Sequence, residues 1–127
     1  MTPSRESKIE ITVHNQFFEE RSLISQDRYF FAYTITIYNH GPYNVKLISR
    51  HWVVENSAGD VFEVKGEGVV GEQPVINIGE SYTYTSGTEI NTPTGCMQGT
   101  YQMLGPDANL FDAKIPKFLL QMPRTLH

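Results

Sequence analysis

A short glycine-rich segment in the middle of the chain has the residue types and spacing of a phosphate-binding loop. The segment KGEGVVGEQP, residues 65–74, contains G-x-G-x-x-G at Gly66, Gly68 and Gly71. In dinucleotide-binding proteins these glycines follow a strand and open a helix, whose free N–H groups point at pyrophosphate. The preceding VFEVK is typical of a strand, but the EQP that follows does not start a helix. A Gly-Lys-Ser/Thr ending is also missing, so the pattern lacks the context that phosphate loops require.

Two interpretations of this glycine loop stay open. In the first, the glycines supply positive φ angles and close backbone approach where the chain crosses between two sheets. In the second, a curled backbone forms a nest of N–H groups that binds pyrophosphate or a dinucleotide polyphosphate. Lys65 would assist such an anion, whereas Glu67 and Glu72 would repel it. We favour the first interpretation and keep the second, a small-ligand sensor, as the alternative.

The segment SRHW, residues 49–52, concentrates polar groups in an otherwise apolar stretch. In a regular strand Arg50 and Trp52 project to one face and His51 to the other. We expect Trp52 to pack in the core. A guanidinium beside it needs a carboxylate partner, a bulge or a bound anion, and we favour the ion pair. The anion alternative adds Arg50 to Lys65 and the three glycines as candidate ligand-binding residues.

The remaining reactive residue types have no spacing that indicates a metal site or a catalytic site. The histidines are far apart, with none of the paired spacings that preset zinc ligands: His14, His40, His51 and His127. Cys96 is the single cysteine, so no intrachain disulfide can form, and it is expected to be a small buried hydrophobic residue. YTSGT is not the nucleophile elbow of hydrolases. We therefore predict no metal, no cofactor and no enzymatic activity.

Length and composition predict a single soluble domain. The chain has 127 residues, of which residues 8–127 are expected to form the domain and residues 1–7 a loose tail. A formal net charge of −4 argues against nucleic acid or an anionic membrane as the partner. No apolar run of about 20 residues is present to span a bilayer, and the first residues lack the apolar core of a secretion signal. A cytoplasmic location is therefore expected.

Alternation of apolar and polar residues is the dominant pattern, and it places all of these groups on or between strands. In YFFAYTITIYN, residues 29–39, aromatic and β-branched residues occupy both faces, which predicts a central strand. No long segment has helical spacing. The short strands and regularly spaced turns predict an all-β fold: an antiparallel β-sandwich of the immunoglobulin or fibronectin type III kind, with about seven to eight strands.

Two details of this strand pattern are specific. Residues 45–65 are predicted to form a hairpin that turns at NSAGD. Pro116 interrupts the last alternating segment, LFDAKIPKFLLQM, so this strand is predicted to lie at a sheet edge or to carry a bulge. Residues 15–28 form a longer polar connection to which the sequence assigns no structure.

The aromatic content favours a protein-binding role. The chain has seven tyrosines and seven phenylalanines, and exposed tyrosines provide contact area and a hydroxyl at low entropic cost. Open sandwiches also have edge strands that accept a strand from another chain. We therefore expect an unidentified protein partner or a homodimer formed through a strand edge. The equally weighted alternative is that the aromatic side chains fill the space between the two sheets.

Several separated motifs together resemble the bacterial ApaG family, also called DUF525. The motifs are FAYTITIYN, SRHWVVEN, GEGVVGEQPVINIGESYTYTSGTEINTPTGCMQGTYQM and IPKFLLQMPRTLH. They follow the order of the family and extend from about residue 7 to residue 127, essentially the whole chain. One departure is Ile78, where the family pattern has proline.

The resemblance implies a fibronectin type III-like sandwich and no established catalytic activity. It also implies a role in protein–protein contacts, because similar domains occur in eukaryotic F-box proteins and in a protein that interacts with DNA polymerase δ. Bacterial members are associated with cobalt resistance and magnesium efflux, and often lie beside a diadenosine tetraphosphatase gene. Pyrophosphate binding at the glycine loop is a further expectation of the resemblance. A soluble β-domain cannot move ions itself, so any effect on efflux is expected to be indirect.

Overall fold

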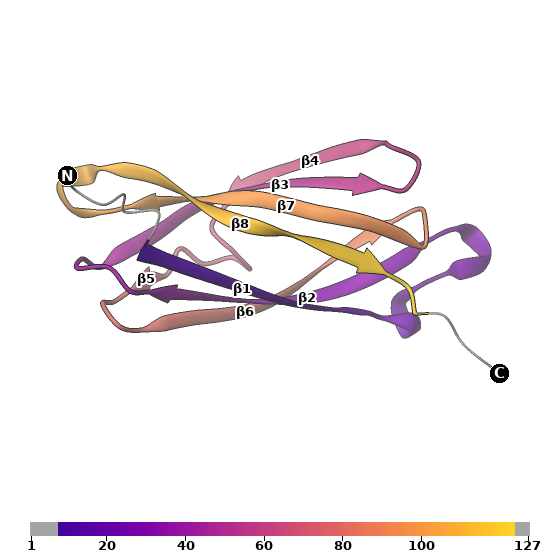
Figure 1. The fold of residues 1–127 in the computed structure, drawn as a ribbon, viewed down its shortest axis with the longest axis horizontal. Helices are drawn as coiled ribbons and strands as arrows, with labels where there is room; N and C mark the ends of the chain where they lie inside the picture. The colour runs from indigo at the N-terminus through magenta and orange to yellow at the C-terminus, as the bar shows by residue number, and fades with distance from the viewer. Residues whose placement is uncertain (1–7, 124–127) are drawn as a thin grey trace.

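The computed structural model describes residues 8–123, and this part of the chain consists mainly of antiparallel strands joined by turns (Figure 1). The predicted tail at residues 1–7 and His127 lie outside the described residues. The strands are β1 (Ile9–Phe17), β2 (Tyr29–Asn39), β3 (Val45–Asn56), β4 (Val61–Glu67), β5 (Val75–Ile76), β6 (Ser81–Ile90), β7 (Thr94–Leu104) and β8 (Leu110–Gln121).

The strands form two sheets packed face to face. One sheet has three strands in the order β1-β2-β6, and the other has five, in the order β4-β3-β7-β8 with β5 also paired to β3. In Figure 1 the five-stranded sheet lies above the three-stranded sheet, and β8 and β1 are adjacent on the side nearest the viewer. The predicted all-β antiparallel sandwich is confirmed, and β2 is the central strand of its sheet as predicted.

Alternation along the strands builds the core between the sheets. The inward-facing residues of β2 are all buried: Tyr29, Phe31, Tyr33, Ile35 and Ile37. From β3, Trp52 is 2% exposed and meets the rings of Tyr33, Tyr101 and Phe118 edge-on, with centroid distances of 5.4, 6.3 and 6.0 Å. The prediction that Trp52 packs in the core is therefore confirmed.

The glycine loop lies between two strands that pair with the same edge of β3. β4 pairs with residues 49–55 of β3, and β5 then pairs with Val45 and Lys46. Pro74 keeps this register, because its carbonyl oxygen accepts a hydrogen bond of 2.9 Å from the N–H of Leu47. The prediction that the chain crosses between the sheets at the glycines is therefore wrong. The loop leaves the edge of β3 after β4, and the chain returns to the same edge at β5. The chain crosses to the other sheet later, between β5 and β6.

Asn39 stabilises the segment in which the chain crosses from one sheet to the other, between β5 and β6. Its side chain is fully buried. The Nδ2 atom donates to the carbonyl oxygens of Tyr43 and Ile76 at 2.7 and 3.0 Å, and Oδ1 accepts from the N–H of Gly41 at 2.9 Å. The backbone of Asn39 also bonds to Gly79 and Glu80. One residue at the end of β2 thus fixes β5, the turn after β2 and the start of β6.

The details predicted for the other strands are also present. Residues 45–56 and 61–67 pair as a hairpin, with the predicted turn between them. β8 is an edge strand, and its register with β7 shifts at Pro116, since Met97 faces Phe118 whereas Gly99 faces Ile115. Of the predicted polar connection at residues 15–28, residues 15–17 belong to β1, and the rest contains two 3-10 turns, Glu19–Arg21 and Ile24–Gln26. Between residues 8 and 123, no helix has the length and apolar character needed to cross a bilayer.

Candidate functional site

The glycine loop folds into a tight hairpin turn. Val69 and Glu72 exchange backbone hydrogen bonds of 2.8 and 2.9 Å, and between them Val70 and Gly71 have φ angles of 44° and 81°. Two positive φ angles inside a two-residue loop define a type I′ turn. Gly68, with φ of 60°, is also required, because a Cβ there would lie 2.1 Å from the carbonyl oxygen of Glu72. No helix follows Gly71, as the sequence predicts.

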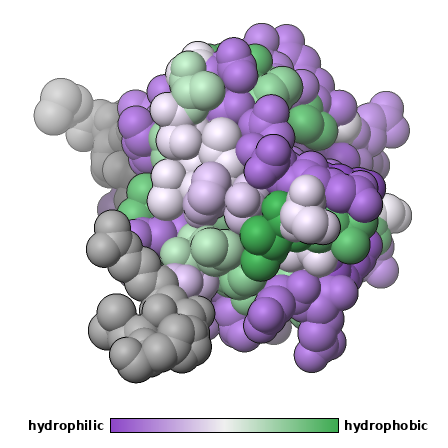
Figure 2. Space-filling model, turned by 90° about the vertical axis from the view of Figure 1, so that its right-hand side faces the viewer, coloured by the Kyte–Doolittle hydropathy of each residue, from purple (hydrophilic) through white to green (hydrophobic). Residues whose placement is uncertain are grey.

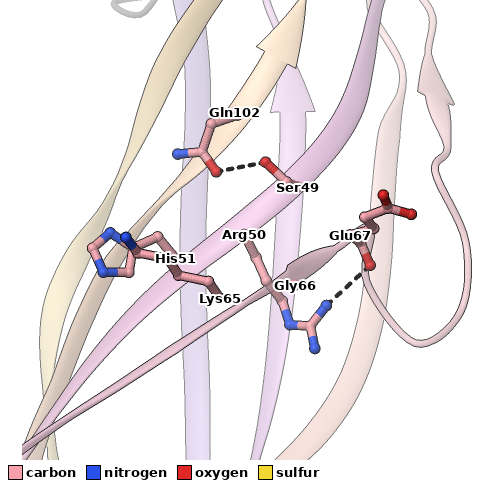
Figure 3. A pocket seen from close by; sticks show the side chains of 7 residues that line it. All are labelled: Ser49, Arg50, His51, Lys65, Gly66, Glu67 and Gln102. Atoms are coloured by element: carbon pink, nitrogen blue, oxygen red, sulfur yellow. Dashed lines mark hydrogen bonds between the residues drawn. The ribbon is translucent and has the colours of Figure 1, made fainter.

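The third glycine, Gly66, makes room for the Arg50 side chain. Arg50 faces Gly66 across the β3–β4 pair, and a Cβ at Gly66 would lie 2.7 Å from Nη1. Nη1 donates hydrogen bonds to the carbonyl oxygens of Glu67 and Gly68, at 3.1 and 2.9 Å. Figure 3 shows the guanidinium directed at Glu67 past the small Gly66 residue. Arg50 therefore fixes the start of the loop, and all three glycines have a structural role.

The prediction that Arg50 forms an ion pair is wrong for the described residues, 8–123. The ion pairs in this range join Arg28 to Glu89, His40 to Glu10 and His51 to Glu63. Arg50 instead uses the carbonyl oxygens at the end of β4, which accept hydrogen bonds as a carboxylate would. β3 also changes register between Leu47 and Ser49, so a strand irregularity lies beside Arg50. The guanidinium charge is left without a described carboxylate within ion-pair distance.

On the outer face of the five-stranded sheet, Lys65 borders an open groove of about 420 Å³. Its lining is Ser49, Arg50, His51, Lys65, Gly66, Glu67 and Gln102 (Figure 3). Ser49 Oγ donates to Gln102 Oε1 at 2.8 Å, and His51 Nε2 lies 2.7 Å from Glu63 Oε1. The groove thus brings together Lys65, Gly66 and Arg50 of the predicted ligand-binding set. Gly71 borders a different cavity.

That second cavity, of about 250 Å³, lies between the two sheets beneath the glycine loop. A third, of about 130 Å³, continues it between β6 and β4. Both cavities are lined by the same central residues, Tyr33, Arg50, Trp52 and Ser86. We call these two adjoining cavities the inter-sheet groove. Sequence reasoning missed it, because its residues come from different sheets; the only signal was the alternation of SYTYTS, which places Tyr84 and Ser86 on one face.

The charge of Arg50 acts on three buried tyrosines, of which Tyr33 and Tyr84 line the groove. The hydroxyls of Tyr84 and Tyr101 are hydrogen-bonded to each other. Burial raises the pKa of Tyr33, Tyr84 and Tyr101 above the usual tyrosine value, while the positive charge of Arg50 acts on each pKa in the opposite direction. All three hydroxyls therefore stay neutral at physiological pH. The lining of the groove thus combines neutral aromatic groups and one guanidinium with Ser86, Glu67 and several apolar side chains.

The described residues contain no cluster that could hold a metal ion. No group of three histidine, cysteine, aspartate or glutamate side chains comes together within residues 8–123. His40 and His51 each contact a single glutamate. Cys96 is a free thiol in β7 and is partly exposed, so the expectation of a buried cysteine is not met.

Comparison with known proteins places this sandwich in a family. The family profile described as ApaG domain (DUF525) matches residues 19–105. The chain belongs to the ApaG family. Protein ApaG of Thiobacillus denitrificans is 52% identical to it over 127 residues, which cover 100% of both chains. Its name states no enzymatic activity.

Solved structures similar to this ApaG-family chain have the same fold. An X-ray structure of a structural-genomics target has 41% identity and a TM-score of 0.90, covering 98% of this chain and 94% of its own. A crystal structure from Bordetella pertussis has 44% identity and a TM-score of 0.87, with 92% and 95% covered. Ile78 stands where the family resemblance implies proline, and its N–H donates to Asn44 Oδ1 at 2.9 Å. Proline could not make that bond.

Proposed function

We propose that this ApaG-family chain is a non-enzymatic β-sandwich module that binds another protein in the cytoplasm. The binding surface is the side of the sandwich where β4 and β6 are the edge strands of the two sheets. Any influence on cobalt resistance or magnesium efflux, which the family resemblance implies, would then be indirect and would depend on the bound partner.

One observation carries this proposal: of the thirteen large hydrophobic residues that are exposed between residues 8 and 123, five lie on the short stretch from β4 to β5. From β4 through the loop to β5, five of them are about half exposed: Val61 56%, Phe62 49%, Val64 46%, Val70 55% and Val75 57%. Contiguous exposed apolar surface is typical of protein-binding sites. Figure 2 shows a different part of the surface, the end of the sandwich where the β3–β4 turn and the connection between β1 and β2 lie, and apolar side chains are exposed there too, among hydrophilic ones.

The aromatic residues support the proposal less than the sequence alone implied. Tyr38 and Tyr43 are 36% and 46% exposed, whereas the tyrosines that fill the space between the sheets are Tyr29, Tyr33, Tyr84 and Tyr101. Exposed and buried tyrosines are thus both present, and the aromatic content favours neither alternative. The apolar edge is the stronger argument.

Affinity capture with a pair of variants tests this function. The protein immobilised as bait is expected to retain a specific partner from a lysate of the source organism. Val64→Lys is expected to reduce recovery of that partner severalfold, because a lysine on an edge strand opposes further pairing. Leu119→Lys is the matched control, since Leu119 is 58% exposed on β8, the opposite edge of the same sheet. Equal recovery with both variants, or no specific protein, would contradict the proposal.

A second function, a sensor of pyrophosphate or a dinucleotide polyphosphate, is favoured by one observation: Lys65, Arg50 and His51 border the same groove. The loop itself offers few donors, because the N–H of Gly68 bonds to the Ile48 carbonyl and those of Val69 and Glu72 bond to each other's carbonyls. Binding would therefore depend on the side chains that border this groove.

Titration of pyrophosphate into isotope-labelled protein tests this second function. The amide resonances of Lys65 and Gly66, which border the groove, are expected to shift, and Lys65→Ala is expected to weaken the response about tenfold, as for the loss of a charge-assisted contact. Amides of Lys65 and Gly66 that stay unchanged at millimolar pyrophosphate would rule the sensor out.

A further inference from the structure

The two sheets do not cover each other completely. The three-stranded sheet ends at β6, while the five-stranded sheet continues one strand further, to β4. Phe62 and Val64 of β4 pair with Val54 and Trp52, which are core residues, so their side chains face the core side. They are nevertheless 49% and 46% exposed. Within residues 8–123 no strand pairs with the outer edge of β6, so the position of a fourth strand above β4 is open.

The outer edge of β6 has backbone groups available for such a strand. The N–H of Asn39 donates to the carbonyl of Glu80. In an antiparallel pair every second residue bonds to the neighbouring strand, so this bond shows that the even-numbered residues of β6 bond to β2. The backbone groups of the odd-numbered residues therefore point away from β2: Ser81, Thr83, Thr85, Gly87 and Glu89. Edge strands are usually protected by lysine, proline or a bulge. β8 carries Pro116 between two lysines and β4 carries Lys65, whereas SYTYTSGTEI has none of these devices.

The inter-sheet groove beneath this open position contains hydrogen-bond donors that lack acceptors. Trp52 Nε1 is the one buried side-chain polar atom without a hydrogen-bond partner among the described residues. Cε3 of the indole lies toward Gly99 on β7, so the ring edge that carries Nε1 is directed away from β7, and Trp52 lines both cavities of the inter-sheet groove. Arg50 uses only Nη1 in its described hydrogen bonds. A guanidinium and an indole N–H beside Ser86 form a set of donors suited to a carboxylate.

We propose that the inter-sheet groove binds an extended acidic segment of a partner protein, which adds to the outer edge of β6 as a fourth strand. Strand addition supplies backbone hydrogen bonds, and the pockets beneath alternate side chains supply specificity. This inference rests on the protein-binding function proposed above and specifies the chemistry of the partner. The carboxylate of the segment meets Arg50 and Trp52, while its apolar side chains cover Val64 and Phe62.

The geometry also sets the order of residues in that segment. Three cavities along the open side show which residues of β6 lie opposite which residues of β4. Tyr84 shares a cavity with the glycine loop, Thr88 shares one with Val64, and Ile90 shares one with Phe62. The two strands therefore run in opposite directions. A strand added antiparallel to β6 therefore runs in the direction of β4. From its N-terminal end it meets Phe62, then Val64, then Arg50. The expected pattern is apolar-x-apolar-x-acidic, with glutamate or aspartate at the last position.

A short blocked peptide, TVTVTET, tests this inference by NMR titration against the whole protein. Trp52 is the single tryptophan, so its indole N–H gives one resonance. We expect this resonance and the amides of Thr85 and Gly87 to shift on binding. Replacing the peptide glutamate by glutamine is expected to weaken binding about tenfold or more, because a charge-assisted hydrogen bond is lost. This comparison changes nothing in the protein.

A second peptide pair tests strand addition itself. N-methylation of the threonine that follows the second valine removes an N–H that faces β6, and we expect it to abolish binding. N-methylation of that valine removes an N–H on the other edge of the peptide, and we expect little change.

Three outcomes would overturn the inference. One is a glutamine peptide that binds as tightly as the glutamate peptide. Another is equal binding of both N-methylated peptides. The last is a stable dimer in sedimentation whose β6 amides are protected from exchange, since a second copy would then occupy the groove. If the peptides fail while Val64→Lys still releases a captured partner, this inference alone falls and the protein-binding function stands.

Discussion

Replacing Trp52 by alanine is expected to lower the free energy of unfolding by about 3–5 kcal/mol, as measured by urea denaturation. Trp52 is 2% exposed and contacts aromatic rings from β2, β7 and β8. Its removal therefore leaves a cavity that borders both sheets. Domains of this size have a total stability of about 5–15 kcal/mol, so the loss is a large share of the whole.

Two further variants separate the causes of this loss. Trp52→Phe is expected to cost only about 1–2 kcal/mol, because it keeps an aromatic ring in the core and removes an N–H that has no partner among the described residues. Val53→Ala, on the outer face of the same strand, is expected to cost less still, since Val53 is only partly buried. A cost for Trp52→Ala no larger than that of Val53→Ala would show that the indole does not join the two sheets.

Asn39→Asp is expected to destabilise the protein by about 3–5 kcal/mol at neutral pH, because it places an uncompensated charge in a buried site. Nδ2 of Asn39 donates to two carbonyl oxygens, of Tyr43 and Ile76. A carboxylate at this position would face both oxygens with no proton to donate. Protonated, it could donate to one of them, so the cost at acid pH is expected to be about 1–3 kcal/mol.

The sign of this pH dependence follows from linkage. Burial and the facing carbonyls raise the folded-state pKa of the introduced carboxyl above its unfolded value of about 3.9. Below the unfolded-state pKa the group is protonated in both states, and the variant has its highest stability. That stability falls as pH rises from the unfolded-state pKa through the folded-state pKa. The difference in unfolding free energy between wild type and Asn39→Asp should therefore grow between about pH 4 and pH 7. Asn39→Ala is the control, and its cost should not depend on pH. A penalty for Asn39→Asp that stays constant or shrinks with rising pH would contradict the assigned hydrogen bonds.

The contrast between Trp52 and Arg50 shows how far the strand pattern alone could predict the candidate site. Alternation correctly predicts that Trp52 is buried, because the side-chain period of a strand depends only on local geometry. The same pattern predicts that Arg50 needs a partner, but not which one. Its partners are carbonyl oxygens of Glu67 and Gly68, and backbone acceptors have no signature in the sequence. The predicted carboxylate partner was wrong for this reason.

The three glycines show a similar division. The sequence excludes a dinucleotide-binding loop, since no helix can start at EQP, and the type I′ turn confirms this. The separate roles of the glycines, two with positive φ and one that admits the Arg50 guanidinium, depend on β3 lying beside β4. The expected crossover was wrong because β5 rejoins the same edge of β3, which no local pattern encodes.

By itself the sequence determined the fold class, most of the strands, the central position of β2, the bulge and edge at Pro116, and membership of the ApaG family, because alternation, turn residues and separated motifs are local properties of the chain. Only the tertiary structure decided which edges stay unpaired and what lies beneath them. The uneven number of strands in the two sheets leaves β6 open above Phe62 and Val64. It also brings Arg50 and Trp52 from β3 together with Ser86 from β6. Such proximity depends on how the two sheets stack, and side-chain periodicity carries no information about that.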